Sequence, residues 1–198
     1  LGQVASLRFF EPSDFMKLDA PTIVNLELVQ GLDGSRKGSL FSLLDQTRTG
    51  MGGRLLKSWL LAPLMSTTGL ERRLDSVQAF SGDIQRLGNV RQSLSAVHDL
   101  ERLTSRVLVG VANPRELLAL RDSSLEVPGI KAALEGMNAV RIAEIRSLLD
   151  PLDDLVRLVS EAIADDPPAS TAEPGIIRAG YSAELDDLRL IRHSGKGY

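Results

Sequence analysis

Apolar and polar side chains alternate at the start of the chain, as they do in half-buried strands. The alternation places apolar residues at Ala5, Leu7 and Phe9, and again at Met16 and Leu18. After Pro21 the apolar residues recur at every third position, which is the spacing of one helical face. The pattern predicts a small extended segment at the N-terminus, followed by helices.

Capping and breaking residues predict where these helices begin and end. Asp19 can cap the first helix, which Gly31 and Gly34 then end. Thr49 can cap another helix, which reaches Leu61 before Pro63 stops it.

Two further sequences are typical of helix starts. Thr68-Gly69-Leu70-Glu71 has the pattern of a capping box, and the helix after it is expected to bury Leu74 and Val77. Asn113-Pro114-Arg115-Glu116 combines a capping Asn with Pro at the first helical position and Glu at the third.

The last third of the chain contains two predicted helices separated by a break. Asp150-Pro151 is expected to open the first, whose apolar face carries Leu152, Leu155, Val156, Val159 and Ile163. The break at residues 165–168 precedes a short apolar piece, Ile176-Ile177, which predicts a small hairpin or turn. The final helix is expected to start near Ser182.

Composition favours a soluble globular domain. The 198 residues are 43% hydrophobic and carry a net charge of −3, and a chain of this length buries roughly 70% of its unfolded surface. The absence of cysteine excludes a disulfide scaffold and fits a cytoplasmic location. No uncharged stretch is long enough to span a membrane. Mild acidity predicts weak DNA binding by this chain alone.

Catalytic and metal-binding patterns are not evident in the sequence. His98 and His193 lie far apart, and the glycines at 50, 52 and 53 lack the Lys-Ser/Thr of a phosphate-binding loop. Gly52 and Gly53 are instead expected to allow close approach of another backbone. The acidic pairs are expected to be solvated faces and caps; they are Asp153-Asp154, Asp165-Asp166 and Asp186-Asp187.

The run from Ser39 to Leu64 resembles the signature of the MutS family core, L-L-D-x-T-x-T-x-M-G-x-R-L-L-x-x-W-L-x-x-P. The residues that carry the signature, and that are expected to have a structural role, are Asp45, Thr47, Thr49, Met51, Gly52, Arg54, Leu55, Leu56, Trp59 and Pro63. Other segments resemble the same family in order along the chain, namely residues 18–22, 73–77, 99–103, 113–117 and 175–181.

This resemblance implies a mainly α fold, a multi-helical core domain of MutS type with an extended N-terminal segment and a truncated lever helix. Residues 1–16 would be the end of a connector region and 17–181 the helical core. Residues 182–198 would start a lever helix leading to an absent clamp domain. The lever helix would lack its partner helix, so Leu185, Leu188 and Ile191 are expected to be uncovered and the helix to fray or self-associate.

The implied role is structural and allosteric, coupling mismatch and DNA-binding domains to a C-terminal ATPase. No cofactor is expected in this chain, whereas ATP and Mg²⁺ are expected for the full-length protein. That protein would bind mismatched duplex DNA through other domains and form a homodimer through the ATPase domain. The start at Leu1 and the end at Tyr198, within a helical run, suggest a piece of a larger protein.

Other interpretations of the sequence stay open. The chain could be a stand-alone helical scaffold or adaptor, an enzyme with an unrecognised site, or the core of a MutS paralogue acting in recombination. Phe9-Phe10-Glu11 matches the family's mismatch-reading Phe-x-Glu pattern. Its position just before the core favours packing at the connector junction instead.

Overall fold

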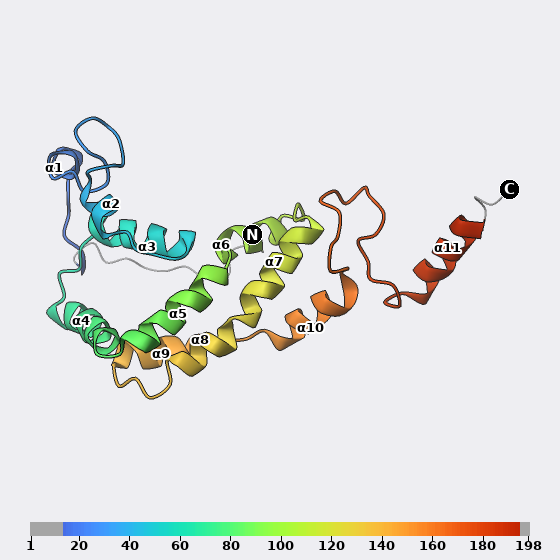
Figure 1. The fold of residues 1–198 in the computed structure, drawn as a ribbon. Helices are drawn as coiled ribbons and strands as arrows, with labels where there is room; N and C mark the ends of the chain where they lie inside the picture. Colours follow the sequence, from blue (N-terminus) through green and yellow to red (C-terminus); the bar gives the residue numbers. More distant parts are fainter. Residues whose placement is uncertain (1–13, 195–198) are drawn as a thin grey trace. The chain divides into compact units, whose positions relative to one another are not determined.

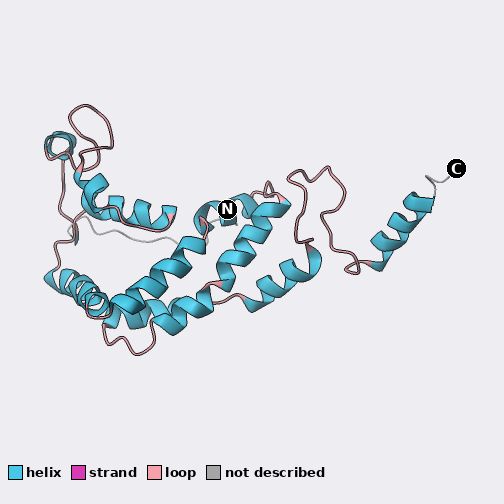
Figure 2. Ribbon diagram, in the orientation of Figure 1, coloured by secondary structure: helices cyan, strands magenta, loops and turns pink. Residues whose placement is uncertain are grey.

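The computed structural model describes residues 14–194, and these residues form α-helices joined by loops (Figures 1 and 2). The helices are α1 (Ala20–Asn25), α2 (Leu40–Leu44), α3 (Gly50–Leu61), α4 (Thr67–Ser81), α5 (Ile84–Ala96), α6 (Leu100–Leu108), α7 (Pro114–Leu125), α8 (Val127–Ala133), α9 (Val140–Leu148), α10 (Asp153–Ala162) and α11 (Ala183–Ser194). The mainly α fold class is confirmed.

β structure within the described residues consists of isolated antiparallel bridges, Phe15 with Leu64 and Ile163 with Ile177. The predicted alternation at Ala5–Phe9 lies outside the described residues. The stretch from Met16 to Asp19 has no regular secondary structure. The described part of the N-terminal segment therefore contributes a single β-bridge, at Phe15, and no strand.

Contacts within the chain divide it into two compact units. Unit 1 comprises Leu1–Arg91 and Ala133–Leu148, and unit 2 comprises Gln92–Ala132 and Leu149–Tyr198. Both units are therefore assembled from segments that are separated in sequence. The domain limits inferred from the resemblance, at residues 17 and 182, stay predictions.

In unit 1, α2 packs against α3 and α4 packs against α9. Ile142 of α9 is only 2% exposed, and Leu134 and Ala139 just before this helix are also buried. A second buried pair, Leu28 and Phe41, lies where the loop after α1 meets α2. There the backbone N–H of Phe41 donates to the carbonyl of Leu28 at 2.9 Å.

The first helix is shorter than predicted. Asp19 caps it as expected, since its carboxylate accepts from the backbone N–H of Thr22 at 2.8 Å. The helix then ends at Asn25 instead of continuing to Gly31, because Glu27 adopts a left-handed φ of 48° that turns the chain. The Glu27 carboxylate holds this turn by accepting from the N–H of Leu32 at 2.7 Å.

The prediction for α4 was wrong in two respects. Its cap is Ser66, whose hydroxyl accepts from the N–H of Gly69 at 3.2 Å, so the helix begins before Thr68. Leu74 and Val77, which were expected to be buried, are 65% and 64% exposed. The side chains of α4 that are half-buried instead include those of Arg73, Ala79 and Phe80.

In unit 2, α7 packs against both α6 and α10. The predicted cap at Asn113 is confirmed, and it forms a full capping box, because Asn113 and Glu116 each accept from the other's backbone N–H at 2.9 Å. The core of this unit contains Leu118, Val159 and Ile163. Leu117, Leu155 and Ile177 pack around that core.

The helix predicted after Asp150 begins later, at Asp153. Leu152 precedes it in a left-handed conformation with a φ of 55°, and no side chain caps the helix. The Asp150 carboxylate accepts from the N–H of Leu152 at 3.0 Å, so it stabilises the turn before the helix. Of the predicted apolar face, Val159 and Ile163 are buried, whereas Leu152 is exposed.

The turn predicted around Ile176-Ile177 is confirmed as a short antiparallel pairing with the end of α10. The N–H of Ala164 donates to the carbonyl of Ile176 at 2.9 Å, and that of Arg178 donates to Ala162 at 2.8 Å. α11 follows at Ala183. Its Leu188 and Ile191 side chains are exposed as expected, whereas Leu185, which was also expected to be uncovered, is half-buried. Among the described helices, none is long and apolar enough to cross a membrane.

Candidate functional site: the signature segment

The signature segment begins with a turn built around the carboxylate of Asp45, immediately after α2. One carboxylate oxygen accepts from the hydroxyl of Thr47 at 2.6 Å and from its backbone N–H at 3.2 Å. The other forms an ion pair with Arg36. The hydroxyl and the N–H of Thr47, together with the charge of Arg36, hold the pKa of Asp45 below its ordinary value. Asp45 therefore acts as an ionised anchor for the turn.

Arg36, in the loop before α2, is a residue of this site that no motif in the sequence indicates. Its guanidinium lies over the ring of Phe41, 4.4 Å from the ring centroid, while it pairs with Asp45. The arginine thus ties the loop before α2 to the turn after it. No periodicity or spacing in the sequence indicates such a pair. The helix α2 lies between the two residues, and they meet only in the folded chain.

Thr49 caps the start of α3, and Gly52 lies in the first turn of that helix. The Thr49 hydroxyl accepts from the N–H of Gly52 at 3.0 Å, which confirms the predicted cap. A Cβ on Gly52 would lie 3.2 Å from the Cβ of Thr47 and 3.2 Å from the Thr49 hydroxyl. The expected approach of another backbone was therefore wrong. The nearest atoms belong to threonine side chains of the same turn.

The far end of the signature is held by two different contacts. Trp59 of α3 lies under the guanidinium of Arg73 of α4, with the guanidinium carbon 3.7 Å from the ring centroid. Burial lowers the pKa of Arg73, and the nearby charge of Arg141 adds to that shift. The carbonyl of Pro63 accepts from the N–H of Met16 at 2.8 Å. The signature therefore ends against the N-terminal segment.

The other signature residues divide between the two faces of α3. Met51 and Leu56 are half-buried, whereas Arg54 is exposed. Leu55 follows Met51 and precedes Trp59 by four residues each, which is the spacing of one helical face, yet it is 52% exposed. The structure thus brings Asp45, Thr47, Thr49 and Gly52 into one cluster, with Trp59 and Pro63 at the other end of the helix.

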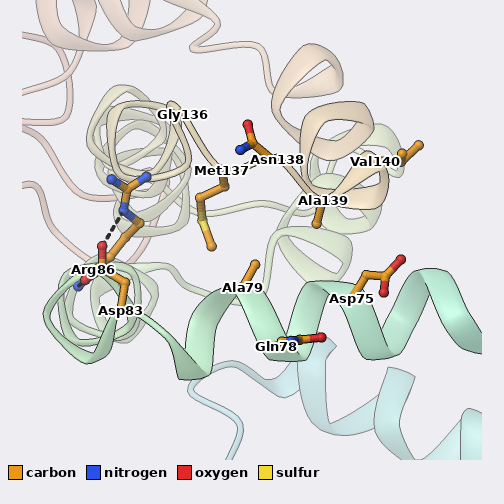
Figure 3. A pocket seen from close by; sticks show the side chains of 10 residues that line it. All are labelled: Asp75, Gln78, Ala79, Asp83, Arg86, Gly136, Met137, Asn138, Ala139 and Val140. Carbon is orange, nitrogen blue, oxygen red and sulfur yellow. Dashed lines mark hydrogen bonds and ion pairs between the residues drawn. The ribbon is translucent and has the colours of Figure 1, made fainter.

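A hollow of about 490 Å³ lies elsewhere in unit 1, between α4, the start of α5 and the turn before α9 (Figure 3). Its cation is Arg86, which donates to the carboxylate of Asp83 at 3.1 Å and to the carbonyl of Glu135. Met137 and Ala79 contribute apolar surface to the lining. Because the guanidinium already binds two protein acceptors, the hollow is best explained as a packing feature between helices.

Several of the remaining candidate groups have hydrogen-bond or ion-pair partners within the chain. The backbone N–H of His98 donates to Ser123 at 2.9 Å, and the side chain of His193 lies outside the described set. Asp165 and Asp186, expected to be solvated or capping, pair with Arg178 and Arg189 respectively. In the described part of the chain, no cluster of three or more His, Cys, Asp or Glu side chains is arranged to hold a metal ion.

These features define a helical chain in which hydrogen bonds hold the signature segment before and after α3. Comparison with known proteins places that domain in a family. Residues 21–193 match the family model described as MutS domain III. The chain therefore belongs to the MutS domain III family.

Individual relatives align with the whole chain. It is 44% identical to the DNA mismatch repair protein MutS of Symbiobacterium thermophilum and 41% identical to that of Halothermothrix orenii. It is 39% identical to that of Methanothrix thermoacetophila. In each comparison 100% of this chain is covered, but it spans only 23%, 22% and 24% of the respective relatives.

Proposed function

We propose that this chain is the structural and allosteric core of a DNA mismatch-repair protein. In this role it couples DNA-binding domains at one end to an ATPase domain at the other, and it is not catalytic itself. The observation that carries the proposal is the attachment of the signature helix α3 at both ends. Asp45, Thr47 and Thr49 fix its start, and the bond between Met16 and Pro63 fixes the chain just beyond its end.

Attachment at both ends suits mechanical coupling. Energy passes between distant sites through packed helices that move as rigid bodies. A displacement of the N-terminal segment would reach α3 through Pro63. It would then reach α4 through the stacking of Arg73 on Trp59. The same contacts would carry a displacement in the opposite direction.

The partners of this role lie outside the chain. Mismatched duplex DNA would bind through other domains of a full-length protein, in the cytoplasm, and the ATPase domain would form the homodimer. The glycine-rich start of α3 does not suit ATP and Mg²⁺. Gly52 and Gly53 lie within a helix that Thr49 already caps, and Arg54 stands where a phosphate-binding loop needs other residues.

A chimaera tests the proposal. The matching segment of the Symbiobacterium thermophilum MutS would be replaced by this chain, with and without the double change Asp45→Ala and Thr47→Ala. We expect the unmodified chimaera to bind mismatched DNA and to change its ATP hydrolysis when it does so. The double variant should still bind mismatched DNA and should still hydrolyse ATP. However, DNA binding should no longer change its rate of ATP hydrolysis.

Gln46→Ala is the matched control, because Gln46 is an exposed residue of the same turn. It should leave the coupling unchanged. The proposal would be wrong if the double variant coupled binding to hydrolysis as well as the control does. It would also be wrong if the chain alone hydrolysed ATP.

A further inference from the structure

The turn that leads into α11 is held by two side chains of that helix. We call residues 177–180 the exit turn. Arg189 donates to the carbonyl of Ile177 at 2.7 Å and to the carboxylate of Asp186 at 2.7 Å. The second oxygen of Asp186 accepts from the backbone N–H of Gly180 at 2.6 Å. Both ends of the exit turn are therefore bound to α11.

The exit turn is also bound to the end of α10. The N–H of Arg178 donates to the carbonyl of Ala162 at 2.8 Å. The Arg178 guanidinium makes two hydrogen bonds to Asp165, at 2.6 and 3.0 Å. A bidentate pair of this kind restricts orientation as well as distance. The turn is thus a polar connection between two helices of unit 2.

Apolar packing covers α11 only in part, because Leu185 is half-buried whereas the other large apolar side chains of the helix are exposed. Leu188, Leu190 and Ile191 are 57%, 66% and 67% exposed. A hollow of about 340 Å³ separates parts of α11 from residues 173–177, with Ile177 and Leu188 in its lining. A helix is normally fixed by burying its apolar face. Because most of that face is exposed in α11, the polar contacts of the exit turn become important for its position.

We propose that Asp186 and Arg189 are positioning residues that set the direction in which α11 leaves the exit turn. Gly180 is the third component, because its φ of +87° lies in a region that side chains disfavour. The importance of this direction for coupling rests on the proposed function, in which α11 leads towards other domains. The clasp itself, formed by Asp186, Arg189 and Gly180, does not depend on that function.

Pulsed electron paramagnetic resonance on the full 198-residue chain tests the clasp. The chain has no cysteine, so Leu158→Cys on α10 and Leu190→Cys on α11 provide two labelling sites, at residues that are 53% and 66% exposed. With the clasp intact we expect a narrow distance distribution. Arg189→Gln should broaden it about twofold, because the released turn behaves as a flexible linker. Circular dichroism would report whether the helices persist.

Arg192→Gln is the control, since Arg192 lies one turn further along α11 and lines the same hollow. Its distribution should match that of the parent chain. Gly180→Ala is a second variant that leaves the sequence of α11 untouched. It strains the turn without a clash, since no atom lies within 4 Å of the added Cβ. It should also broaden the distribution.

Equal widths in the parent chain, Arg189→Gln and Gly180→Ala would overturn the clasp, whatever the chimaera shows. If Arg189→Gln unfolds α11, the width of the distance distribution in Gly180→Ala alone tests the clasp. A chimaera that fails to couple, alongside a clasp that behaves as expected, would overturn the proposed function and leave the clasp standing.

Discussion

The guanidinium of Arg73 stacks on the indole of Trp59, 3.7 Å from the ring centroid, and so joins α4 to α3. Both side chains are half-buried. Cation–π contacts range from about 0.5 kcal/mol at exposed sites to about 2 kcal/mol when desolvated. This half-buried contact is expected to lie between these limits, and it links the signature helix to α4.

Removing that stack should be visible in the fluorescence of Trp59, which is the single tryptophan of the chain. We expect Arg73→Ala to shift the emission and to lower the free energy of unfolding by about 1 kcal/mol. Arg72→Ala is the control, because Arg72 forms only an exposed pair with Glu144 at 3.7 Å. An unchanged spectrum for Arg73→Ala would show that the stack is absent in solution.

The position of the α4 cap gives a second prediction. Ser66→Ala should lower the free energy of unfolding by about 1 kcal/mol, because the N–H of Gly69 loses its acceptor. Thr68→Ala should be neutral or slightly stabilising, since Thr68 is an exposed residue inside the helix and alanine is the better helix former. Urea denaturation of both variants decides the matter. A larger loss for Thr68→Ala would restore the capping box predicted from the sequence.

Gly52 and Gly53, in the first turn of α3, should respond differently to alanine. A Cβ on Gly53 would meet its nearest atom at 3.5 Å, which is an ordinary contact. Gly53→Ala should therefore be neutral or stabilise the chain by up to about 1 kcal/mol through helix propensity. Gly52→Ala should be less stable than Gly53→Ala, because its Cβ would press on Thr47 and Thr49 at 3.2 Å. Equal unfolding midpoints would contradict the close contact.

Asp45 should make the stability of the chain depend on acidity. Its pKa is lowered in the folded protein, first by the Thr47 hydroxyl, then by the Thr47 N–H and by Arg36. A carboxyl group whose pKa is lowered by folding stabilises the folded protein at pH values above its ordinary pKa. That stabilisation is lost as the pH falls through the lowered pKa of the folded state. Below about pH 4, Asp45→Asn should therefore lose stability less steeply than the parent chain. Parallel urea midpoints for the two proteins down to acid pH would contradict this.

The corrected burial of α4 can be tested against that of α9. Ile142 is 2% exposed, so Ile142→Ala should cost about 2–4 kcal/mol of folding free energy. Leu74 is 65% exposed, and Leu74→Ala should cost well under half as much. Thermal unfolding of both variants measures the difference. Comparable losses would mean that Leu74 is covered in solution.

Some features followed from the sequence alone because they depend on neighbouring residues. The caps at Asp19, Thr49 and Asn113 were predicted correctly, since a capping side chain bonds a backbone N–H two or three residues away. The mainly α fold followed from the helical spacing of apolar residues. The family resemblance followed from the order of several motifs, and the family comparison confirmed it.

Other features depended on which segments meet in space, and only the tertiary structure decided them. The pairing of Arg36 with Asp45, the stacking of Arg73 on Trp59 and the bond from Met16 to Pro63 each join residues that no local pattern relates. The exposure of Leu74 was mispredicted for the same reason. Periodicity shows that a helix has an apolar face. Burial of that face requires another segment to pack against it, and which segment does so depends on the tertiary structure.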